Sequence, residues 1–344
     1  MQSYRIKMKK SVSQRDIAKM LGINVSTVSR ALKGLAGVSP DLRQKITQLA
    51  EKQGYHPNPL AMSLRYNITH TIGIIVPDIS FNHYAQIVKW IEAEARMNGY
   101  MCIVTDSGDK LIGETDCIQR LLNLHVEGIA ICLSQETVEY AHLERLKDKH
   151  IPFVLFDRVA NIDCPTISSN DVESARQATL HLIDGGARRI AFLGGPNRMK
   201  QTIDRKHGYL EALRERRINI KKKLVKCGHV SFNSGLSDTL DLLGQQDPPD
   251  AILTCHGMLS ISAFQAIIGK GLRIPEDISI IGFMSDWVSG MSYPRMTFVK
   301  QNLKEVGRKT FELLYNQING DDTIRNITID ARLNIRESTR KGER

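Results

Sequence analysis

From Thr71 to about residue 283 the sequence alternates short apolar runs with longer amphipathic stretches. The runs are rich in Ile, Val, Leu and Phe and lack polar alternation, which is typical of strands buried on both faces. The pattern predicts strands at 72–76, 101–105, 128–132, 153–156, 189–193, 225–227, 251–254 and 278–281, and helices at 85–97, 172–184, 206–216 and 258–270. This alternation indicates parallel, doubly wound sheets covered by helices.

The N-terminal segment has a different pattern, typical of three short helices. Ser13 offers a hydroxyl N-cap to the first helix, and Gly22 ends it. A second helix is expected over 25–32. Ser39 followed by Pro40 is a start signal for a third, which Gly54 ends. Short helices separated by a glycine-containing turn predict a helix-turn-helix fold.

The positive charge of the chain is concentrated in this segment. Residues 1–66 hold 12 of the 47 Lys and Arg but three of the 37 Asp and Glu, a net +9 out of +10 for the chain. A basic end on a nearly neutral body predicts a module that binds a polyanion. The alternative is a disordered basic tail. The spacing of basic among apolar residues favours the folded module.

In a helix-turn-helix, the start of the second helix enters the major groove. Val25 can contact a thymine methyl group, Ser26 can hydrogen-bond several bases, and Arg30 can contact guanine or a phosphate. Ser29 lies beside Arg30, one turn further along. Phosphate contacts, which position the helix-turn-helix domain on the DNA, are expected from Ser11, Asn24 and Thr27. The alternative role for each side chain is solvation or helix capping.

Several motifs in this region resemble those of the lactose/galactose repressor (LacI/GalR) family. They are V-S-Q-R-D-I-A at 12–18, G-I-N-V-S-T-V-S-R-A-L at 22–32, V-S-P at 38–40 and G-Y-H-P-N-P-L-A at 54–61, and the similarity continues to about residue 338. The resemblance implies a sequence-specific transcriptional regulator, expected to repress a carbohydrate-utilisation operon, with a two-lobed core like the periplasmic binding proteins. It also implies a homodimer on a pseudo-palindromic operator.

The resemblance divides the chain into four parts. Residues 1–57 form the helix-turn-helix domain and residues 58–67 a hinge helix or linker. The N-terminal lobe of the effector-binding core takes 68–165 and 294–322, and the C-terminal lobe takes 166–293 and 323–338.

The hinge carries Leu60, Ala61 and Leu64 at helical spacing, but a helix this short is marginal by itself. In the family this segment folds on DNA and inserts a leucine into the minor groove. The resemblance gives Leu64 that role, with Asn58 and Arg65 as further DNA contacts. The alternative is that Leu60 and Leu64 pack on the core.

Small molecules bind α/β proteins at the carboxyl ends of parallel strands, between lobes. The candidates for effector contacts therefore follow the expected strands, although each could instead be a cap, an inter-lobe ion pair or a surface residue. In the first lobe they are Asp78, His83, Tyr84, Asp106, Ser134, Asp157 and Arg158. In the second lobe they are Met199, Gln201, Arg205, Cys255, His256, Met284 and Asp286.

Three positions depart from the family pattern. Ile203 stands where many sugar-binding relatives have an arginine, Thr254-Cys255-His256 replaces alanine-asparagine-aspartate, and Met284 replaces an aspartate. These departures argue against carrying over a neutral hexose as effector. Arg158, Arg205 and His256, with Arg198 and Lys200, suggest an anionic ligand such as a sugar acid or sugar phosphate.

Other classes of function are disfavoured. The chain shows no dinucleotide fingerprint, phosphate-binding loop or nucleophile elbow, so neither an enzyme nor a cofactor is expected. The six cysteines lack metal-ligand spacing, and several lie in apolar runs as reduced core residues. No apolar segment follows the basic start of the chain, so export is not expected. No stretch approaches about 20 uninterrupted apolar residues, so a membrane span is not expected. A cytoplasmic location is expected. Two further alternatives are a periplasmic solute receptor, which the attached basic module disfavours, and a sequence-indifferent DNA binder, which a specific recognition helix joined to a large neutral core disfavours.

Overall fold

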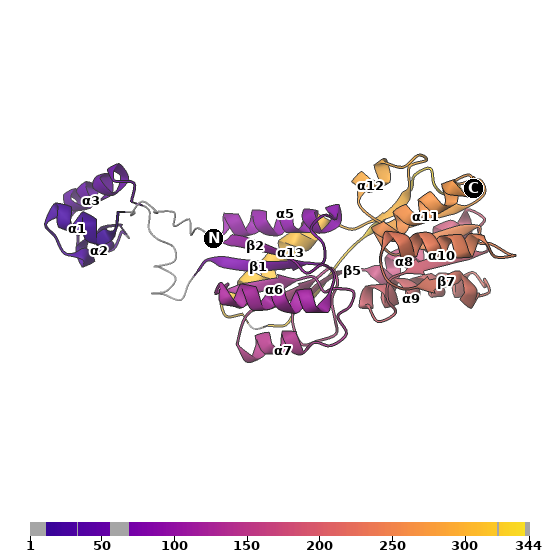
Figure 1. Cartoon of the computed structure of the whole chain (residues 1–344), viewed down its shortest axis with the longest axis horizontal. Helices are drawn as coiled ribbons and strands as arrows, with labels where there is room; N and C mark the ends of the chain where they lie inside the picture. The colour runs from indigo at the N-terminus through magenta and orange to yellow at the C-terminus, as the bar shows by residue number, and fades with distance from the viewer. Residues whose placement is uncertain (1–11, 33, 56–68, 322, 341–344) are drawn as a thin grey trace, which may run out of the picture. The chain divides into compact units, whose positions relative to one another are not determined.

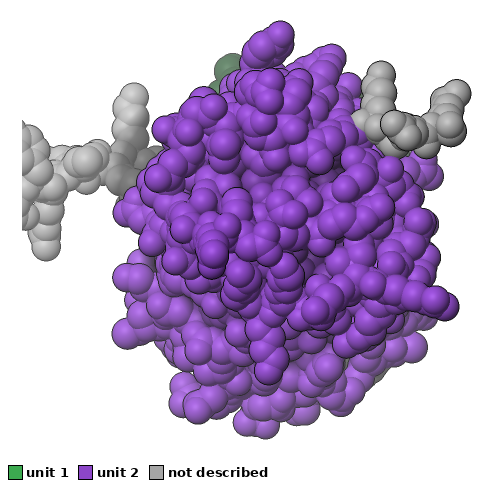
Figure 2. All heavy atoms as spheres, turned by 90° about the vertical axis from the view of Figure 1, so that its right-hand side faces the viewer, with its two compact units in different colours: residues 1–69 green, residues 70–344 purple. Residues whose placement is uncertain are grey.

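The computed structural model describes residues 12–32, 34–55, 69–321 and 323–340. The chain forms two compact units, residues 1–69 and residues 70–344 (Figure 1). Figure 2 shows the second unit as one continuous body, in purple. No helix among these residues is long and apolar enough to cross a membrane.

The first unit contains the three expected helices, α1 (Gln14–Leu21), α2 (Val25–Leu32) and α3 (Pro40–Lys52). Ser13 and Asp16 form a capping box at the start of α1, in which the Asp16 carboxylate accepts a hydrogen bond from the Ser13 backbone N–H at 2.9 Å. Gly22 follows α1 with φ of 64°, a conformation that glycine adopts without steric cost. The buried side chains of the three helices form one small core: Ile17, Ala18, Val28, Ala31, Ile46 and Ala50.

The second unit contains two six-stranded sheets, each the centre of one lobe. The first sheet has the order β11-β5-β4-β3-β1-β2, and all its strand pairs are parallel. Its strands are β1 (Thr71–Val76), β2 (Met101–Asp106), β3 (Gly128–Ile131), β4 (Phe153–Phe156), β5 (Thr166–Ser169) and β11 (Asn326–Ile329). Its helices are α5 (Asn82–Met97), α6 (Leu111–Asn123), α7 (Ala141–Asp148) and α13 (Leu303–Ile318).

Strand β1 shows why the apolar runs lack alternation. Ile72, Ile74 and Val76 pack in the cluster that α5 and α13 cover, whereas Ile75 packs on the opposite face with residues of α6 and α7. Successive side chains of a strand point to opposite faces. A strand covered on both faces must therefore be apolar at every position, as the sequence predicted.

The second sheet has the order β12-β10-β9-β8-β6-β7, and β12 is antiparallel to β10. Its strands are β6 (Ile190–Gly194), β7 (Val225–Cys227), β8 (Ala251–Thr254), β9 (Ser279–Phe283), β10 (Thr297–Lys300) and β12 (Arg332–Asn334). Its helices are α8 (Asp171–Asp184), α9 (Lys200–Glu215), α10 (Phe232–Leu243), α11 (Gly257–Gly269) and the short α12 (Asp286–Gly290), with a 3₁₀ turn, η1 (Lys222–Leu224), before β7. The expected α/β class and parallel doubly wound sheets are confirmed.

The chain passes between the lobes more than once, and three strands next to these passages belong to the lobe opposite to the one expected. Thr166–Ser169 pairs with β4 in the first sheet, Thr297–Lys300 pairs with β9 in the second, and Asn326–Ile329 pairs with β5 in the first. These strands are short, and two of them contain several polar residues, so no apolar run marks them. The first lobe comprises residues 71–169, 303–321 and 323–329, and the second lobe comprises residues 171–300 and 332–340.

Candidate effector cavity and DNA-contacting helix

A cavity of about 590 Å³ lies between the two lobes of the second unit, at the carboxyl ends of both sheets. Its volume is in the usual range for small-molecule sites. Ten of the expected effector contacts line it: Asp78, His83, Tyr84, Asp106, Asp157, Arg158, Gln201, Arg205, His256 and Met284. Residues separated by more than 200 positions in the sequence thus meet around one space.

The other four candidates lie elsewhere. The backbone N–H of Ser134 donates to Glu114, Met199 is buried at the start of α9, and Cys255 is buried with its carbonyl accepting from Arg205. Asp286 lines a neighbouring groove of about 940 Å³. All four follow strands, but their side chains point into the protein or away from the cavity opening.

The neighbouring groove shares Asn82, His83, Met284, Ser285 and Gln301 with the effector cavity. Trp90 of α5 and Trp287 of α12 both line it, and these are the two tryptophans of the chain. The Lys304 ammonium lies 4.6 Å from the centre of the Trp90 ring.

Several lining residues were missing from the sequence-based set. Asp109, Lys110, Gln135 and Glu136 lie a few residues beyond β2 and β3, residues 229–232 follow β7, and Gln301 follows β10. The rule that ligands bind beyond strand ends would have found the residues after β2, β3 and β7 if a wider window had been searched. Gln301 carried no such signal, because β10 was not expected as a strand.

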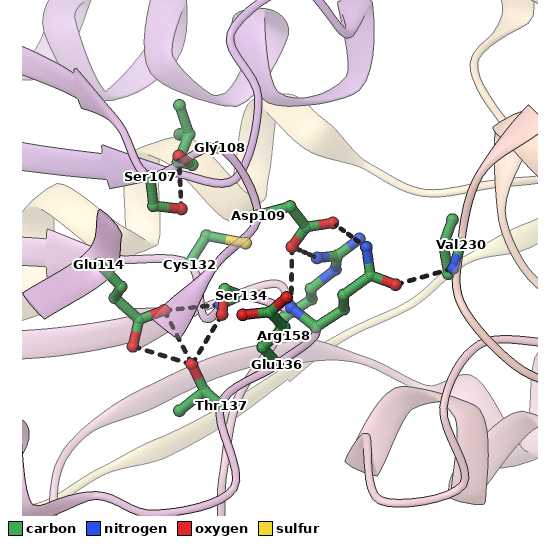
Figure 3. A network of polar contacts seen from close by, with 12 residues as sticks. Ser107, Gly108, Asp109, Glu114, Cys132, Ser134, Glu136, Thr137, Arg158 and Val230 are labelled. Carbon is green, nitrogen blue, oxygen red and sulfur yellow. Dashed lines mark hydrogen bonds and ion pairs between the residues drawn. The ribbon is translucent and has the colours of Figure 1, made fainter. Parts of the chain in front are cut away.

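A polar network joins the two lobes at one side of the cavity (Figure 3). Arg158 donates to Asp109 at 2.6 Å, and the backbone and side chain of Gln135 both donate to the same carboxylate at 2.8 Å. The side-chain oxygen of Gln135, Oε1, in turn accepts a hydrogen bond from the backbone N–H of Val230 at 2.7 Å. Because Gln135 belongs to the first lobe and Val230 to the second, this is a direct hydrogen bond between lobes.

A buried carboxylate, that of Glu114, binds the loop that carries Gln135. Glu114 of α6 is fully buried and accepts from the Ser134 backbone N–H at 2.6 Å and from the Thr137 hydroxyl at 3.2 Å. The His142 ring nitrogen lies 2.6 Å from the same carboxylate. Buried polar groups with this many partners fix the backbone around them, so the position of Gln135 is set by the fold.

Asp157 is the buried carboxylate at the end of β4. His83 Nε2 lies 3.1 Å from it, and the Gln301 amide donates to it at 3.4 Å. Burial raises the pKa of Asp157, but the charge and hydrogen bond of His83 and the attraction of Arg205 and Arg158 outweigh burial and hold it below its usual value. Asp157 is therefore an ionised acceptor inside the cavity.

Arg205 of α9 is almost fully buried and forms part of the second-lobe wall. Its Nε donates to Asp171 at 2.7 Å, its Nη1 donates to the Cys255 carbonyl, and its guanidinium lies 3.9 Å from the centre of the Phe283 ring. Its Nη2 is a buried donor without a partner among the described residues, as is Nε of Arg158. An unpaired buried donor costs free energy, so these two nitrogens are the least satisfied polar atoms of the two arginines.

His256 begins α11 and its ring reaches the cavity with Nε2 unpartnered in the described structure. The buried hydroxyl of Thr202 is unpartnered in the same sense. A Cβ built on Gly195 would lie 2.9 Å from this hydroxyl and 3.0 Å from the His256 nitrogen, so both polar atoms lie beside a backbone with no side chain. Burial, with the nearby charges of Arg205 and Arg158, lowers the pKa of His256 well below its usual value. His256 is therefore neutral at physiological pH.

Helix α2 of the first unit has a buried face and an outward face. Val28 and Ala31 are buried in the core, whereas Asn24, Val25, Ser26 and Arg30 are exposed. Thr27 and Ser29 are half-buried at the boundary. The expected base-contacting residues therefore share the free surface at the start of α2. Ser11, Asn58, Leu64 and Arg65 lie outside the described residues.

A three-helix reader joined in one chain to a two-lobed ligand-binding core defines the class of ligand-responsive DNA-binding regulators. Comparison with family models agrees. Residues 13–58 match the bacterial regulatory proteins of the lacI family, and residues 69–337 match the periplasmic binding proteins and sugar binding domain of the LacI family. The chain belongs to the LacI family of transcriptional regulators, and it is not an enzyme.

Curated relatives are similar over nearly their whole length. The chain is 29% identical to catabolite control protein A of Priestia megaterium, with 96% of this chain and 100% of the relative covered. It is 31% identical to the probable transcriptional repressor ExuR of Bacillus subtilis, over 96% of this chain and 99% of that one.

Two solved structures share the fold. A complex of the regulator CelR with cellobiose has 26% identity and a TM-score of 0.73, covering 95% of this chain and 99% of that one. The lac repressor dimer bound to operator has 23% identity and a TM-score of 0.85, covering 96% and 100%.

Proposed function

We propose that the chain represses a carbohydrate-utilisation operon and that a small carbohydrate-derived effector binds in the cavity between the lobes. The observation that carries this proposal is the cavity itself, which lies between the lobes and whose lining includes the buried polar side chains of Arg158, Arg205 and His256. Relatives named for a ribose operon and for a cellobiose complex support the carbohydrate class. Effector binding would alter operator affinity by its differential affinity for two lobe arrangements, typically ~1–3 kcal/mol of coupling.

The DNA contacts belong to the same proposal. Val25 and Ser26 would reach base edges in the major groove, with Ser29 and Arg30 one turn further along and Asn24 and Thr27 on phosphates. Their exposure at the start of α2 supports this assignment. Ser11 and Asn58 are proposed as further phosphate contacts, and Leu64 and Arg65 of the hinge (58–67) as minor-groove and phosphate contacts, from the family resemblance.

We also propose a homodimer formed through the core. Strand β2 is an edge strand of the first sheet, and its Met101 is 66% exposed, with Met97 of the adjoining α5 and Ile112 of α6 exposed as well. The second lobe exposes Trp287, Met291 and Tyr293, the last at 93%. Exposed apolar side chains beside an unpaired strand edge are typical of a subunit interface. A two-fold dimer would present two readers to a pseudo-palindromic operator with half-sites about one helical turn apart. Its place of action would be the cytoplasm, where operator DNA lies.

Selection of operators from genomic DNA tests the proposal. Purified full-length protein is incubated with sheared DNA from its source organism, and the retained fragments are sequenced. We expect enrichment of a few short palindromes near genes of carbohydrate metabolism, with retention that falls steeply as salt rises. Indiscriminate retention at every salt concentration would contradict sequence-specific regulation. Addition of pooled sugars, sugar acids and sugar phosphates to a second sample then shows whether an effector changes retention.

A further inference from the structure

The two walls of the effector cavity differ in chemistry. The first-lobe wall carries five acidic side chains: Asp78, Asp106, Asp109, Glu136 and Asp157. Two cations, Lys110 and Arg158, stand on the same wall. This wall therefore carries three more carboxylates than Lys and Arg side chains, and its one histidine, His83, is already paired with Asp157.

Half of the fourteen residues that form the second-lobe wall are apolar, and the described residues that form it include no acid. Seven of them are apolar: Val230, Phe232, Met258, Ile261, Phe283, Met284 and Val288. Its one cation, Arg205, is already paired with the buried carboxylate of Asp171 behind it.

This arrangement leaves little positive charge for an anionic ligand. Arg158 is paired with Asp109 and Arg205 with Asp171, so both buried guanidinium groups already have counter-charges. A carboxylate or phosphate entering the cavity would instead approach the excess negative charge of the first-lobe wall. Like charges at short range in a partly buried site are strongly unfavourable.

The first-lobe wall has spare hydrogen-bond acceptors rather than spare positive charge. A carboxylate accepts about four hydrogen bonds, and Asp106 has two that the structure shows, from the backbone N–H groups of Ile79 and Gly108. The first-lobe wall therefore offers spare acceptors for donor groups. The unpartnered donors, Arg158 Nε and Arg205 Nη2, are single buried nitrogens, each suited to one oxygen atom.

We infer that the effector carries no net negative charge and has two faces, a donor-rich face of hydroxyl or ammonium groups toward the first lobe and an apolar face toward the second. This inference rests on the proposed function and specifies its ligand class as a neutral glycoside or an amino sugar with an apolar ring face or substituent. It replaces the anionic ligand that the isolated basic residues suggested, because that suggestion did not include their buried partners.

A matched set of ligands tests the inference. Full-length protein is melted with methyl glycoside, phenyl glycoside, 2-amino sugar, uronic acid and 6-phosphate forms of glucose, galactose and mannose, each at the same concentration. A ligand that binds the folded state raises Tm. We expect Tm to rise with members of the neutral or amino group and not with uronic acids or phosphates. A larger rise with amino sugars than with methyl glycosides would identify an ammonium donor, and the reverse would identify hydroxyl donors alone.

Variants on each wall localise the binding. Phe232→Ala should reduce the Tm rise with phenyl glycosides more than that with methyl glycosides, because it removes apolar surface from the second-lobe wall. Leu240→Ala, on the exposed face of the same helix α10, is the matched control and should change neither. Glu136→Gln should weaken amino sugars more than neutral glycosides.

The outcomes separate this inference from the proposed function. A Tm rise confined to uronic acids or phosphates overturns the inference while leaving a ligand-responsive regulator. If no member of the set raises Tm, small molecules that the protein retains from a cell extract are identified by mass spectrometry. A retained anion, or no retained molecule at all from a protein that still selects operators, also overturns it. Failure to select operators would instead remove the proposed function.

Discussion

At the scale of single residues, burial and neighbouring charges determine the protonation states of the side chains that line the cavity. His256 is 9% exposed and stays neutral because burial and two neighbouring arginines disfavour its protonated form. Asp157 stays ionised because His83 and the same arginines outweigh its burial. The residues that line the cavity thus include a neutral imidazole and an ionised carboxylate at physiological pH.

This balance predicts a pH dependence of stability. In the unfolded chain His256 takes up a proton near pH 6.5, whereas in the folded protein it does not until a much lower pH. Below about pH 6.5 the unfolded state therefore binds more protons, and the free energy of unfolding falls by up to ~1.4 kcal/mol per pH unit from this residue. His256→Gln should flatten the fall of Tm between pH 6.5 and 5. Burial raises the pKa of Asp171 to about 6, and this carboxylate titrates in both proteins, so the difference isolates His256. An unchanged slope would contradict a neutral buried His256.

A second residue-scale prediction concerns the reader. Val25→Ala and Ser26→Ala should each cost about 1–3 kcal/mol of operator binding and relax the preference at one base pair. Gln48→Ala, exposed on α3, serves as the control. Fluorescence anisotropy with the selected operator and with single-base variants measures both effects. A uniform loss on all sequences would assign the residue to phosphate contact.

At the scale of elements, the loop after β3 determines how the lobes meet. Glu114 fixes this loop from within the first lobe, and its Gln135 reaches the backbone of Val230 in the second. Gln135→Ala removes that hydrogen bond together with the side-chain hydrogen bond to Asp109, and should weaken effector binding by about 1–2 kcal/mol, because this arrangement of the lobes loses contacts. Gln119→Ala, which removes a hydrogen bond only to the side chain of Asn123 on the exposed face of α6, should leave binding unchanged. Calorimetric titration with the identified effector distinguishes the two.

The elements also show how far sequence could predict this protein. Strands covered on both faces produce uninterrupted apolar runs, so β1, β3, β4, β6, β8 and β9 were predictable, and the edge strands β2 and β7 were found from their apolar residues although they are partly exposed. Strands β5 and β11 lie at crossings, where T-I-S-S and N-I-T-I resemble loops, and their pairing depends on segments about 160 residues apart. The cavity was predictable where a polar residue directly follows a strand. It was not predictable at Asp109 and Gln135, whose roles come from loops that fold back, nor for the charge of the cavity, because the partners of Arg158 and Arg205 are set by tertiary contacts.

At the scale of the whole molecule, the apolar edge of the first sheet predicts self-association. Met101→Glu together with Val104→Glu would place charge along the β2 edge and should convert a dimer to monomers without lowering Tm by more than a few degrees. Ile203→Glu, at an exposed apolar position of α9, controls for the added charge. Sedimentation velocity measures the oligomeric state. A dimer that persists in the double variant would exclude this edge as the interface.

The groove that shares a wall with the effector cavity has an optical consequence. Both tryptophans of the chain line this groove, with Trp287 on the second lobe and Trp90 on the first, and His83 and Gln301 belong to both spaces. A change in the angle between the lobes alters the surroundings of both indole rings at once. The intrinsic emission of the unlabelled protein should therefore shift when effector binds, so that it reports lobe closure in real time. Stopped-flow recording of that emission would give the rate of the allosteric step separately from the rate of DNA release.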